Sequence, residues 1–512
     1  MYLSMKKIIP GLIVVFLSLC MTVDAKPLKS DKVIKAYLTE STEYTDTLTP
    51  VQYVDDLSSI ADMKYTDNTY AYQDGKVYYR RYHEDSYEET ALWGYYGFLP
   101  GTEKEIVCID SDGNETELFD DEGFGDIYLI DNRFYMTDAI LHEENGIVHT
   151  DTRLYSVDMQ GCGRIDYGNG NILVIDKDRK IMIVNDRNRY FVIDYETAER
   201  KPISFDYDND YIQIKTYQEG WIYYEKSEKD YSVRRLCAVS LEGEQREIIA
   251  LTSDTNTRPY GYKETILNTE VDEERIYFIF GGYDGSAQVF QGGQLISVRL
   301  DGTDYKAVDT NMDDFYLSHH NGKPLIYYSP NYHYRKAVSN EQYETAVWDI
   351  EADICAHSDF PESLLSVYSA QAGPIWHYYP ADQGVLCGTT SYDAVLEERK
   401  ENIYAIPDDS GKIVRVVMNL DDRITKWEND EVNMIQYKDL YYADGFLYFT
   451  AIYSAYDKDA SIGWRDGYRR LRTEVYRLKT GEDDAQMLYC YYSRPGRYFA
   501  ATQRFFINRR TA

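Results

Sequence analysis

The stretch Asp74-Gly75-Lys76-Val77-Tyr78-Tyr79 decides how this chain folds. Asp-Gly supplies the positive φ angles that a tight hairpin turn needs. The residues after it alternate between apolar and polar, which is typical of a strand. This half-motif, a turn followed by a paired aromatic, returns along the chain. Its copies lie near residues 78, 135, 183, 223, 277, 327, 386 and 448.

A second half-motif alternates with the first and has the form of a strand that runs into another turn. Clear copies are Leu154-Tyr155-Ser156-Val157-Asp158-Met159-Gln160-Gly161 and Leu295-Ile296-Ser297-Val298-Arg299-Leu300-Asp301-Gly302. Each unit therefore contains at least two hairpin-forming strands and has room for four. The predicted units are 69–119, 124–166, 168–204, 210–250, 264–308, 314–360, 370–420 and 433–492.

Repeats of this size predict an all-β fold, because a four-stranded propeller blade needs about 40–50 residues. One blade cannot bury both of its own faces, and radial stacking solves that problem. The sequence therefore predicts a β-propeller of about eight four-stranded blades. Seven blades is the alternative, since the third and seventh units are weak. The 53 tyrosines among 512 residues agree with strands, in which aromatic residues are favoured.

The N-terminus has the pattern of an export signal. A short basic start at Met5-Lys6-Lys7 precedes the apolar stretch from Ile8 to Leu19, and Ala25 is the small residue expected before cleavage. We expect residues 1–25 to be a cleaved signal peptide and the protein to be secreted or at the cell surface. A lipoprotein signal at Cys20 and an uncleaved anchor remain open, and no later segment is apolar enough to span a bilayer.

The rest of the chain divides into three parts. Residues 26–68 form an N-terminal segment, 69–492 the propeller, and 493–512 a basic aromatic tail. A closed ring should leave no long aromatic edge exposed, so we expect a terminal segment to pair into the last blade. Gln52-Tyr53-Val54 has strand character and is favoured for that role over the tail.

The repeated Asp-Gly-x-Ile-Tyr-Tyr pattern, followed by Leu-Tyr-x-Val-Asp-x-x-Gly, resembles a propeller domain found in many exported bacterial proteins. That family is similar to the propellers of low-density-lipoprotein-receptor-related proteins. The resemblance covers most of residues 69–492 and implies architecture, since the bacterial family has no assigned activity. No unit contains the Tyr-Trp-Thr-Asp motif of the receptor propellers, which argues against a lipoprotein-receptor role.

The charge of the chain disfavours one class of partner, and the spacing of its cysteines predicts their redox state. The formal net charge of −33 disfavours nucleic acid, whose phosphates such a surface repels. Six cysteines follow the expected signal, none at a Cys-x-x-Cys spacing, and buried free thiols are expected although export permits disulfides. Calcium is a weak possibility at Asp110–Glu115 and Asp206–Asp210, although ordinary hairpin turns also explain these acidic runs.

A catalytic constellation is hard to find in the sequence. There is no Gly-x-Ser-x-Gly elbow, no phosphate-binding glycine loop and no His-Glu-x-x-His. His319, His333 and His377 could meet at a propeller axis, which leaves a metal-dependent polysaccharide lyase or hydrolase as an alternative. We expect no cofactor and, on balance, no enzymatic activity. A structural assembly role is the third possibility.

Aromatic-rich insertions offer a better lead to function. Tryptophan, tyrosine and arginine dominate binding hot spots because they combine a large rigid surface with a polar group. The sequence therefore predicts a binding module that recognises a peptide, glycan or partner protein. The candidate ligand-binding residues are Trp93, Tyr95, Tyr96, Tyr332, Tyr334, Trp376, Tyr378, Trp464 and Arg465.

Overall fold

A computed structural model of the 512-residue chain contains strands and no helix in the residues it describes. Those residues are 33–35, 44–45, 52–54, 70–82, 104–121, 123–144, 147–205, 211–227, 233–252, 262–284, 289–320, 323–330, 346–351, 354–357, 376–381, 384–393, 398–407, 412–417, 426–427, 430–431, 434–456, 468–479 and 485–492.

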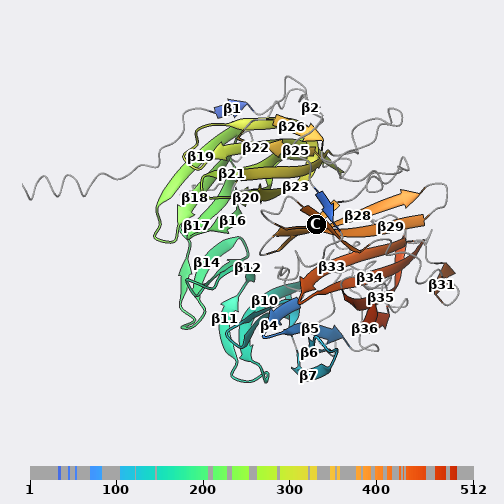
Figure 1. The fold of residues 1–512 in the computed structure, drawn as a ribbon. Coiled ribbons are helices and arrows are strands. Elements are labelled where there is room, and N and C mark those ends of the chain that lie inside the picture. The colour runs from blue at the N-terminus through green and yellow to red at the C-terminus, as the bar shows by residue number, and fades with distance from the viewer. Residues whose placement is uncertain are drawn as a thin grey trace, which may run out of the picture. The chain divides into compact units, whose positions relative to one another are not determined.

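Four-stranded antiparallel meanders follow one another along this part of the chain (Figure 1). The first four consist of β4 (Tyr70–Gln73), β5 (Lys76–Tyr82), β6 (Lys104–Asp110) and β7 (Glu115–Asp120); β8 (Phe124–Ile130), β9 (Arg133–Glu144), β10 (Ile147–Asp158) and β11 (Ile165–Asn169); β12 (Asn171–Asp176), β13 (Ile181–Asp186), β14 (Arg189–Asp194) and β15 (Arg200–Pro202); and β16 (Tyr211–Gln218), β17 (Trp221–Ser227), β18 (Val233–Ser240) and β19 (Gln245–Thr252).

The later meanders repeat the plan. They consist of β20 (Tyr262–Val271), β21 (Arg275–Asp284), β22 (Val289–Arg299) and β23 (Lys306–His320); β23 again with β24 (Lys323–Pro330), β25 (Ala346–Asp349) and β26 (Ile354–His357); β27 (Trp376–Ala381), β28 (Gly384–Asp393), β29 (Glu398–Pro407) and β30 (Lys412–Val417); and β33 (Met434–Ala443), β34 (Phe446–Tyr456), β35 (Tyr468–Lys479) and β36 (Gln486–Tyr492). The short strands β31 (Lys426–Trp427) and β32 (Asp430–Glu431) form a hairpin of their own.

This succession of four-stranded antiparallel sheets confirms the predicted all-β propeller fold. β23 is 15 residues long, so it ends one meander and begins the next. The chain divides into two compact units, one of residues 1–40 and 204–309 and the other of residues 41–203 and 310–512, and the boundary falls inside β23. The number of blades stays a prediction.

The turn residues act as the sequence predicts. Asp74, Asp131 and Asp444 lie before β5, β9 and β34 with positive φ angles near 50°. In the second half-motif, Asp158 accepts backbone N–H bonds from Gln160 (3.0 Å) and Cys162 (2.8 Å). Local hydrogen bonds of this kind fix tight turns without help from the rest of the fold.

Asp110, in the acidic run considered for calcium, has the same turn role as Asp158. Its carboxylate accepts the Asn114 backbone N–H at 2.8 Å and the Asn114 side-chain amide at 3.0 Å. These bonds lower the pKa of Asp110. The residues that the structure describes contain no group of three or more His, Cys, Asp or Glu side chains placed to hold a metal ion.

The paired aromatics of the first half-motif serve two neighbours at once. Successive side chains in a strand point to opposite faces, so Tyr78 and Tyr79 enter different hydrophobic clusters. Tyr78 packs edge-on against Phe134 of the second meander, with ring centroids 5.7 Å apart. Tyr79 stacks on Tyr489 of the last meander at 5.8 Å. Both faces of a blade are buried, and both positions must therefore be large and apolar.

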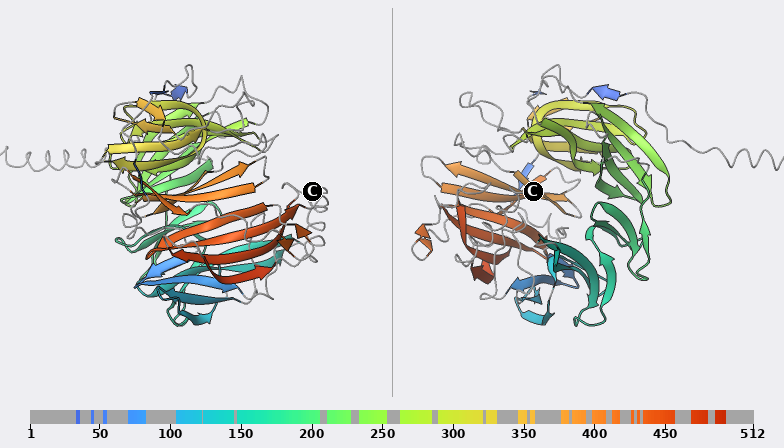
Figure 2. Two further views of the ribbon diagram at one scale, coloured as in Figure 1. Left: turned by 45° about the vertical axis from the view of Figure 1, so that its right-hand side comes forward. Right: turned by 180° about the vertical axis from the view of Figure 1, so that it is seen from behind.

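The first and last meanders lie side by side (Figure 2), and their contact is called the seam below. One hydrophobic cluster spans it, and Tyr70 stacks on Tyr441 with ring centroids 5.3 Å apart. Two hydrogen bonds cross it as well: Arg477 donates to the Asp110 carbonyl at 2.9 Å, and Tyr489 donates to the Arg80 carbonyl at 2.9 Å. The two sheets share no strand in the part of the chain that is described.

Gln52–Val54 forms a strand, as expected, but its partner differs from the one predicted. This strand, β3, runs parallel to β30 in the seventh meander and not beside β36 of the last. The last meander is complete because residues 434–492 supply four strands of their own. The last meander therefore needs no terminal strand at the seam, where side-chain packing makes the contact with the first meander. The tail, 493–512, lies outside the described residues.

Four cysteines can be compared with the expectation of buried free thiols. Cys108 and Cys237 are buried and free, and burial raises the pKa of Cys237 to about 12. Cys162 is free but exposed, because it lies in the turn after Asp158. Cys490 is free and half-buried.

The seam predicts a stability test. Replacing Tyr79, which is 1% exposed, by alanine should lower the free energy of unfolding by about 3–5 kcal/mol, the range for a buried aromatic. Tyr211→Ala is the matched control: this side chain is 48% exposed, and its loss should change stability by less than about 0.5 kcal/mol. Guanidinium unfolding followed by fluorescence measures both. Equal midpoints for the two variants would show that the seam contributes nothing.

Two glycines in equivalent turns give a second test. Gly243 (φ +91°) and Gly302 (φ +81°) both donate to the carbonyl three residues before them. A Cβ at Gly243 meets nothing within 4 Å, whereas one at Gly302 overlaps the Ile248 carbonyl oxygen. Gly243→Ala should cost about 1–2 kcal/mol of backbone strain, and Gly302→Ala should cost clearly more. Thermal unfolding of the two variants compares them, and the reverse order would contradict the packing described.

Candidate functional site

The two ends of the meanders differ in the longest connections that they carry, although the second-to-third-strand hairpins of the second and third meanders are short as well. At one end the first strand joins the second, and the third joins the fourth, through two to six residues. We call this the turn end. At the opposite end, the loop end, the second strand joins the third and the fourth leads to the next meander. The long connections 83–103, 331–345, 358–375 and 457–467 all leave from loop ends.

The strands before two of these connections, β5 and β34, belong to neighbouring sheets. Arg477 lies near the turn end of β35 and bonds to Asp110, the last residue of β6 at its turn end. The turn ends of the first and last meanders therefore coincide across the seam, and so do their loop ends. The strands that precede the segments 83–103 and 457–467 therefore end, at Tyr82 and Tyr456, on the same side of neighbouring sheets. These two segments of the sequence carry five of the nine predicted ligand-binding residues.

The structure places two of the nine residues in a strand. Trp376 and Tyr378 belong to β27, where they lie opposite Thr389 and Cys387 of β28. The prediction that these two residues lie in an insertion and not in a strand is therefore wrong. The remaining candidates lie outside the described residues: Trp93, Tyr95, Tyr96, Tyr332, Tyr334, Trp464 and Arg465. Of the three histidines considered for a metal site, His319 is in β23, His377 is in β27, and His333 is outside the described residues.

A buried ion pair lies directly beneath the first loop end. Arg80, near the end of β5, binds Asp121 at 2.5 Å, and both side chains are at most 4% exposed. The Asp121 carboxylate also accepts the Gly123 N–H at 2.7 Å and the Tyr155 hydroxyl at 3.3 Å. Burial is the largest single effect and would lower the pKa of Arg80, but the charge of Asp121, its hydrogen bond and the nearby tyrosines together outweigh it and raise that pKa. The pair fixes the strand end from which residues 83–103 depart.

The next residue, Arg81, forms ion pairs with three glutamates of the same sheet. It contacts Glu105 at 2.6 Å, Glu115 at 3.1 Å and Glu117 at 2.5 Å. Glu115 in turn accepts the Tyr79 hydroxyl at 2.6 Å, which links the network to the seam. The loop end of the first meander is therefore held by charged side chains on both faces.

A second buried charge cluster occurs in the other unit. The Glu225 carboxylate, fully buried in β17, contacts Lys215 of β16 at 2.7 Å and Arg234 of β18 at 2.9 Å. It also accepts the Thr265 hydroxyl of β20 at 2.7 Å. Burial lowers the pKa of Lys215, and Glu225 offsets part of that effect. Glu225 and Arg234 flank the connection 228–232, so charge is again buried at a loop end.

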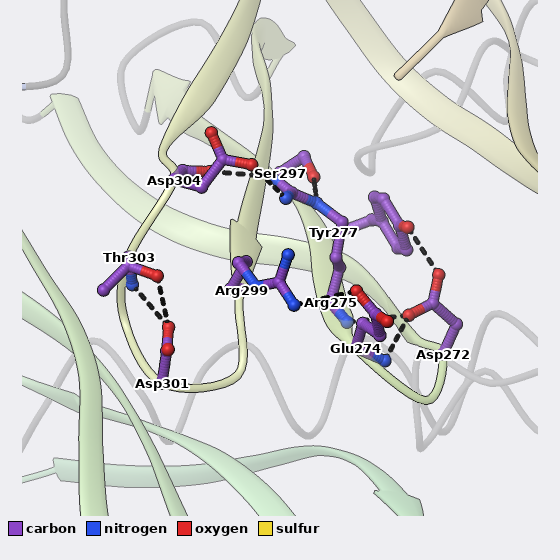
Figure 3. A network of polar contacts seen from close by, with 9 residues as sticks. All are labelled: Asp272, Glu274, Arg275, Tyr277, Ser297, Arg299, Asp301, Thr303 and Asp304. Atoms are coloured by element: carbon purple, nitrogen blue, oxygen red, sulfur yellow. Dashed lines mark hydrogen bonds and ion pairs between the residues drawn. The ribbon is translucent and has the colours of Figure 1, made fainter. Parts of the chain in front are cut away.

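The turn end has a different kind of polar contact, shown in Figure 3. Arg275, at the start of β21, donates to Ser297 at 2.7 Å, to the Asp304 carboxylate at 2.6 Å and to the Asp304 carbonyl at 2.7 Å. Arg133 makes an equivalent set in the second meander, with Ser156 at 3.1 Å and the Gly163 carbonyl at 2.6 Å. An arginine that ties two turns of its own sheet has a structural role, which fits its recurrence in the repeat.

The charged residues at the loop ends were not anticipated from the sequence. Arg80 and Glu225 sit in strands directly after paired tyrosines, where an exposed polar position would be ordinary. One feature of the sequence could have indicated their role: Arg80 and Glu225 each follow a pair of tyrosines near the end of the second strand of a meander. Their partners are distant or in other strands, so the sequence could not show that these charges are paired inside.

Comparisons with known proteins add likenesses of fold. No protein-family model and no curated protein matches the chain. Among solved structures, the β-propeller domain of the Trilobed protease from Pyrococcus furiosus has 11% identity and a TM-score of 0.35, covering 85% of this chain and 100% of that one. Porphyromonas gingivalis dipeptidyl peptidase 4 has 9% identity and a TM-score of 0.40, covering 85% of this chain and 62% of that chain.

TolB from Acinetobacter baumannii is a further similar structure, at 12% identity and a TM-score of 0.25, covering 68% of this chain and 80% of that one. At such low similarity, function has to follow from the chain's own geometry. The described part of the chain holds no helix long and apolar enough to cross a membrane. The similarity to lipoprotein-receptor-related propellers stays a prediction.

The buried pair at the loop end predicts a non-additive mutational effect. Arg80→Met should destabilise the fold by about 3–5 kcal/mol, because it leaves the Asp121 charge buried without its cation. The double variant Arg80→Met/Asp121→Leu should recover most of that loss, since it removes both charges. Urea unfolding of the two variants and of Asp121→Leu completes the cycle. A double variant as unstable as the sum of the singles would mean that the two residues do not interact.

Proposed function

We propose that this protein is exported and acts as a binding module, recognising a peptide, glycan or partner protein at the loop ends of its blades. The observation that carries the proposal is the asymmetry of the connections. Turn ends are joined by two to six residues, while the aromatic-rich insertions all leave from loop ends. Loops on a rigid scaffold are where binding residues concentrate.

The framework beneath these insertions supports the proposal. Arg80 with Asp121 fixes the strand end before residues 83–103 by a buried charge contact of 2.5 Å. Glu225 with Lys215 and Arg234 does the same beside the shorter connection 228–232, by contacts of 2.7 and 2.9 Å. Holding the strand ends reduces the conformational freedom that binding would otherwise have to remove. Tryptophan, tyrosine and arginine in the attached segments supply the side chains common in hot spots.

The ligand can be found with arrays of glycans, peptides and bacterial surface proteins, probed with purified residues 26–512. Against the ligand identified, Trp93→Ala/Tyr95→Ala/Tyr96→Ala and Trp464→Ala/Arg465→Ala should each weaken binding at least about tenfold. Met487→Ala is the control, because this side chain is 45% exposed and lies in the strand that begins at the turn end of the last sheet. It should bind like the wild type.

Two results would count against the proposal. One is turnover of a screened polysaccharide without stable binding, which would favour the lyase or hydrolase alternative. The other is a ligand whose affinity falls with Met487→Ala and is unaffected by both loop variants. Export is tested separately by N-terminal sequencing of the secreted protein, which should begin at Lys26.

A further inference from the structure

The N-terminal segment lies along the outer edges of three sheets. Its strands β1 (Val33–Lys35), β2 (Tyr44–Thr45) and β3 (Gln52–Val54), together called the strap, each add a fifth strand to a meander. β1 pairs with β19, β2 with β26 and β3 with β30, and all three pairings are parallel. The sheets themselves are antiparallel, so the strap is the exception to their pattern.

One edge that the strap covers, that of β19, differs from edges elsewhere in the described chain. In β19, Ile249, Ala250 and Leu251 are at most 3% exposed, so the stretch of this outer strand that pairs with β1 is apolar. By contrast, β7 carries exposed Glu115 and Glu117. Such charges are a usual means of keeping another strand from pairing with a free edge.

Two more outer strands carry such protection. β15 is only three residues long and ends at Pro202, which has no N–H to donate. β11 is irregular in its backbone, because Gly168 within it has a φ of +87°. The strap thus pairs with an unprotected edge at β19, while β7, β11 and β15 are unsuited to a further strand.

Each contact of the strap is small. Its strands contribute three, two and three residues, joined by residues 36–43 and 46–51. A pairing of two or three residues holds weakly on its own, whereas linked pairings reinforce one another through high effective concentration. Each meander has four strands without the strap, so the loss of one strap pairing leaves the other backbone ladders of that sheet in place.

We propose that the outer edges of β19, β26 and β30 are acceptor sites for an extended strand in parallel orientation, which the strap of a second copy of this chain can occupy. A second copy is the natural occupant because it offers the same register: Ile34 opposite Leu251, and Tyr53 opposite Ile413. Exchange of identical segments forms the same contacts between chains as within one, so its energetic cost is small. The site is separate from the loop ends, and its ligand is a backbone edge.

The test uses the mature chain with Ile34→Pro and Tyr53→Pro, which remove strap N–H groups and block pairing in β1 and β3. The control chain carries Asp31→Pro and Ser58→Pro, outside the strap strands. Hydrogen exchange should become at least about tenfold faster at backbone amides of β19 and β30 in the test variant. Amides of β7 and β15 should not change in either chain.

A synthetic peptide of residues 29–58 then serves as the probe. It should restore slow exchange at β19 and β30 of the test variant, and the same peptide with both prolines should not. Mixing the test variant with tagged wild-type chain should give a mixed dimer by light scattering. Unchanged exchange at β19 and β30 in the test variant, no restoration by the wild-type peptide, or no mixed dimer with the wild-type chain overturns the proposal.

A variant that unfolds is recognised by fast exchange in β34 and β35, which the strap does not touch. In that case the folded wild-type chain is used instead. Labelled peptide in excess should replace its strap over time and remain bound to the chain through gel filtration. A chain that never takes up the peptide contradicts an exchangeable strap. None of these readouts depends on a ligand at the loop ends.

Discussion

The structure depends on one constraint: a blade packed on both sides has two faces to bury. Because neighbouring residues of a strand point to opposite faces, Tyr78 and Tyr79 must both be large and largely apolar, and the same holds wherever the half-motif returns. Tyrosine suits this position better than phenylalanine when its hydroxyl can reach a polar partner. The Tyr79 hydroxyl reaches Glu115 at 2.6 Å, and that of Tyr277 reaches Asp272 at 2.5 Å.

Much of this architecture could be predicted because it is encoded locally. A turn such as Asp74-Gly75 and the strand after it are specified by adjacent residues, and repetition makes the signal unmistakable. The partner of Gln52–Val54 could not be found in this way. Parallel pairing with β30 joins segments some 360 residues apart, and three residues carry no information about which edge they meet. The requirement for a terminal strand in the last blade also assumed that only backbone pairing could close it, whereas tyrosine packing makes that contact.

The candidate site was accessible to sequence reasoning only in part. Insertion lengths and their aromatic content are visible in the sequence, and the structure adds that they share one end of each sheet. Trp376 and Tyr378 were placed wrongly because a strand of six residues at the end of an insertion resembles the insertion itself. The Arg80–Asp121 pair was invisible, since 41 residues and a long insertion separate its members.

The seam also bears on how the chain is made. Each meander can form from neighbouring residues, but the seam joins Asp110 to Arg477, 367 residues later. At about 5–20 residues per second of synthesis, the two partners emerge roughly 20–70 seconds apart. During that interval the face of the first sheet that carries Tyr70 and Tyr79 has no last sheet to cover it. The nascent chain therefore exposes an aggregation-prone aromatic surface during most of its synthesis. Chaperones or export factors that cover such surfaces would determine what fraction of the chains reaches the native state.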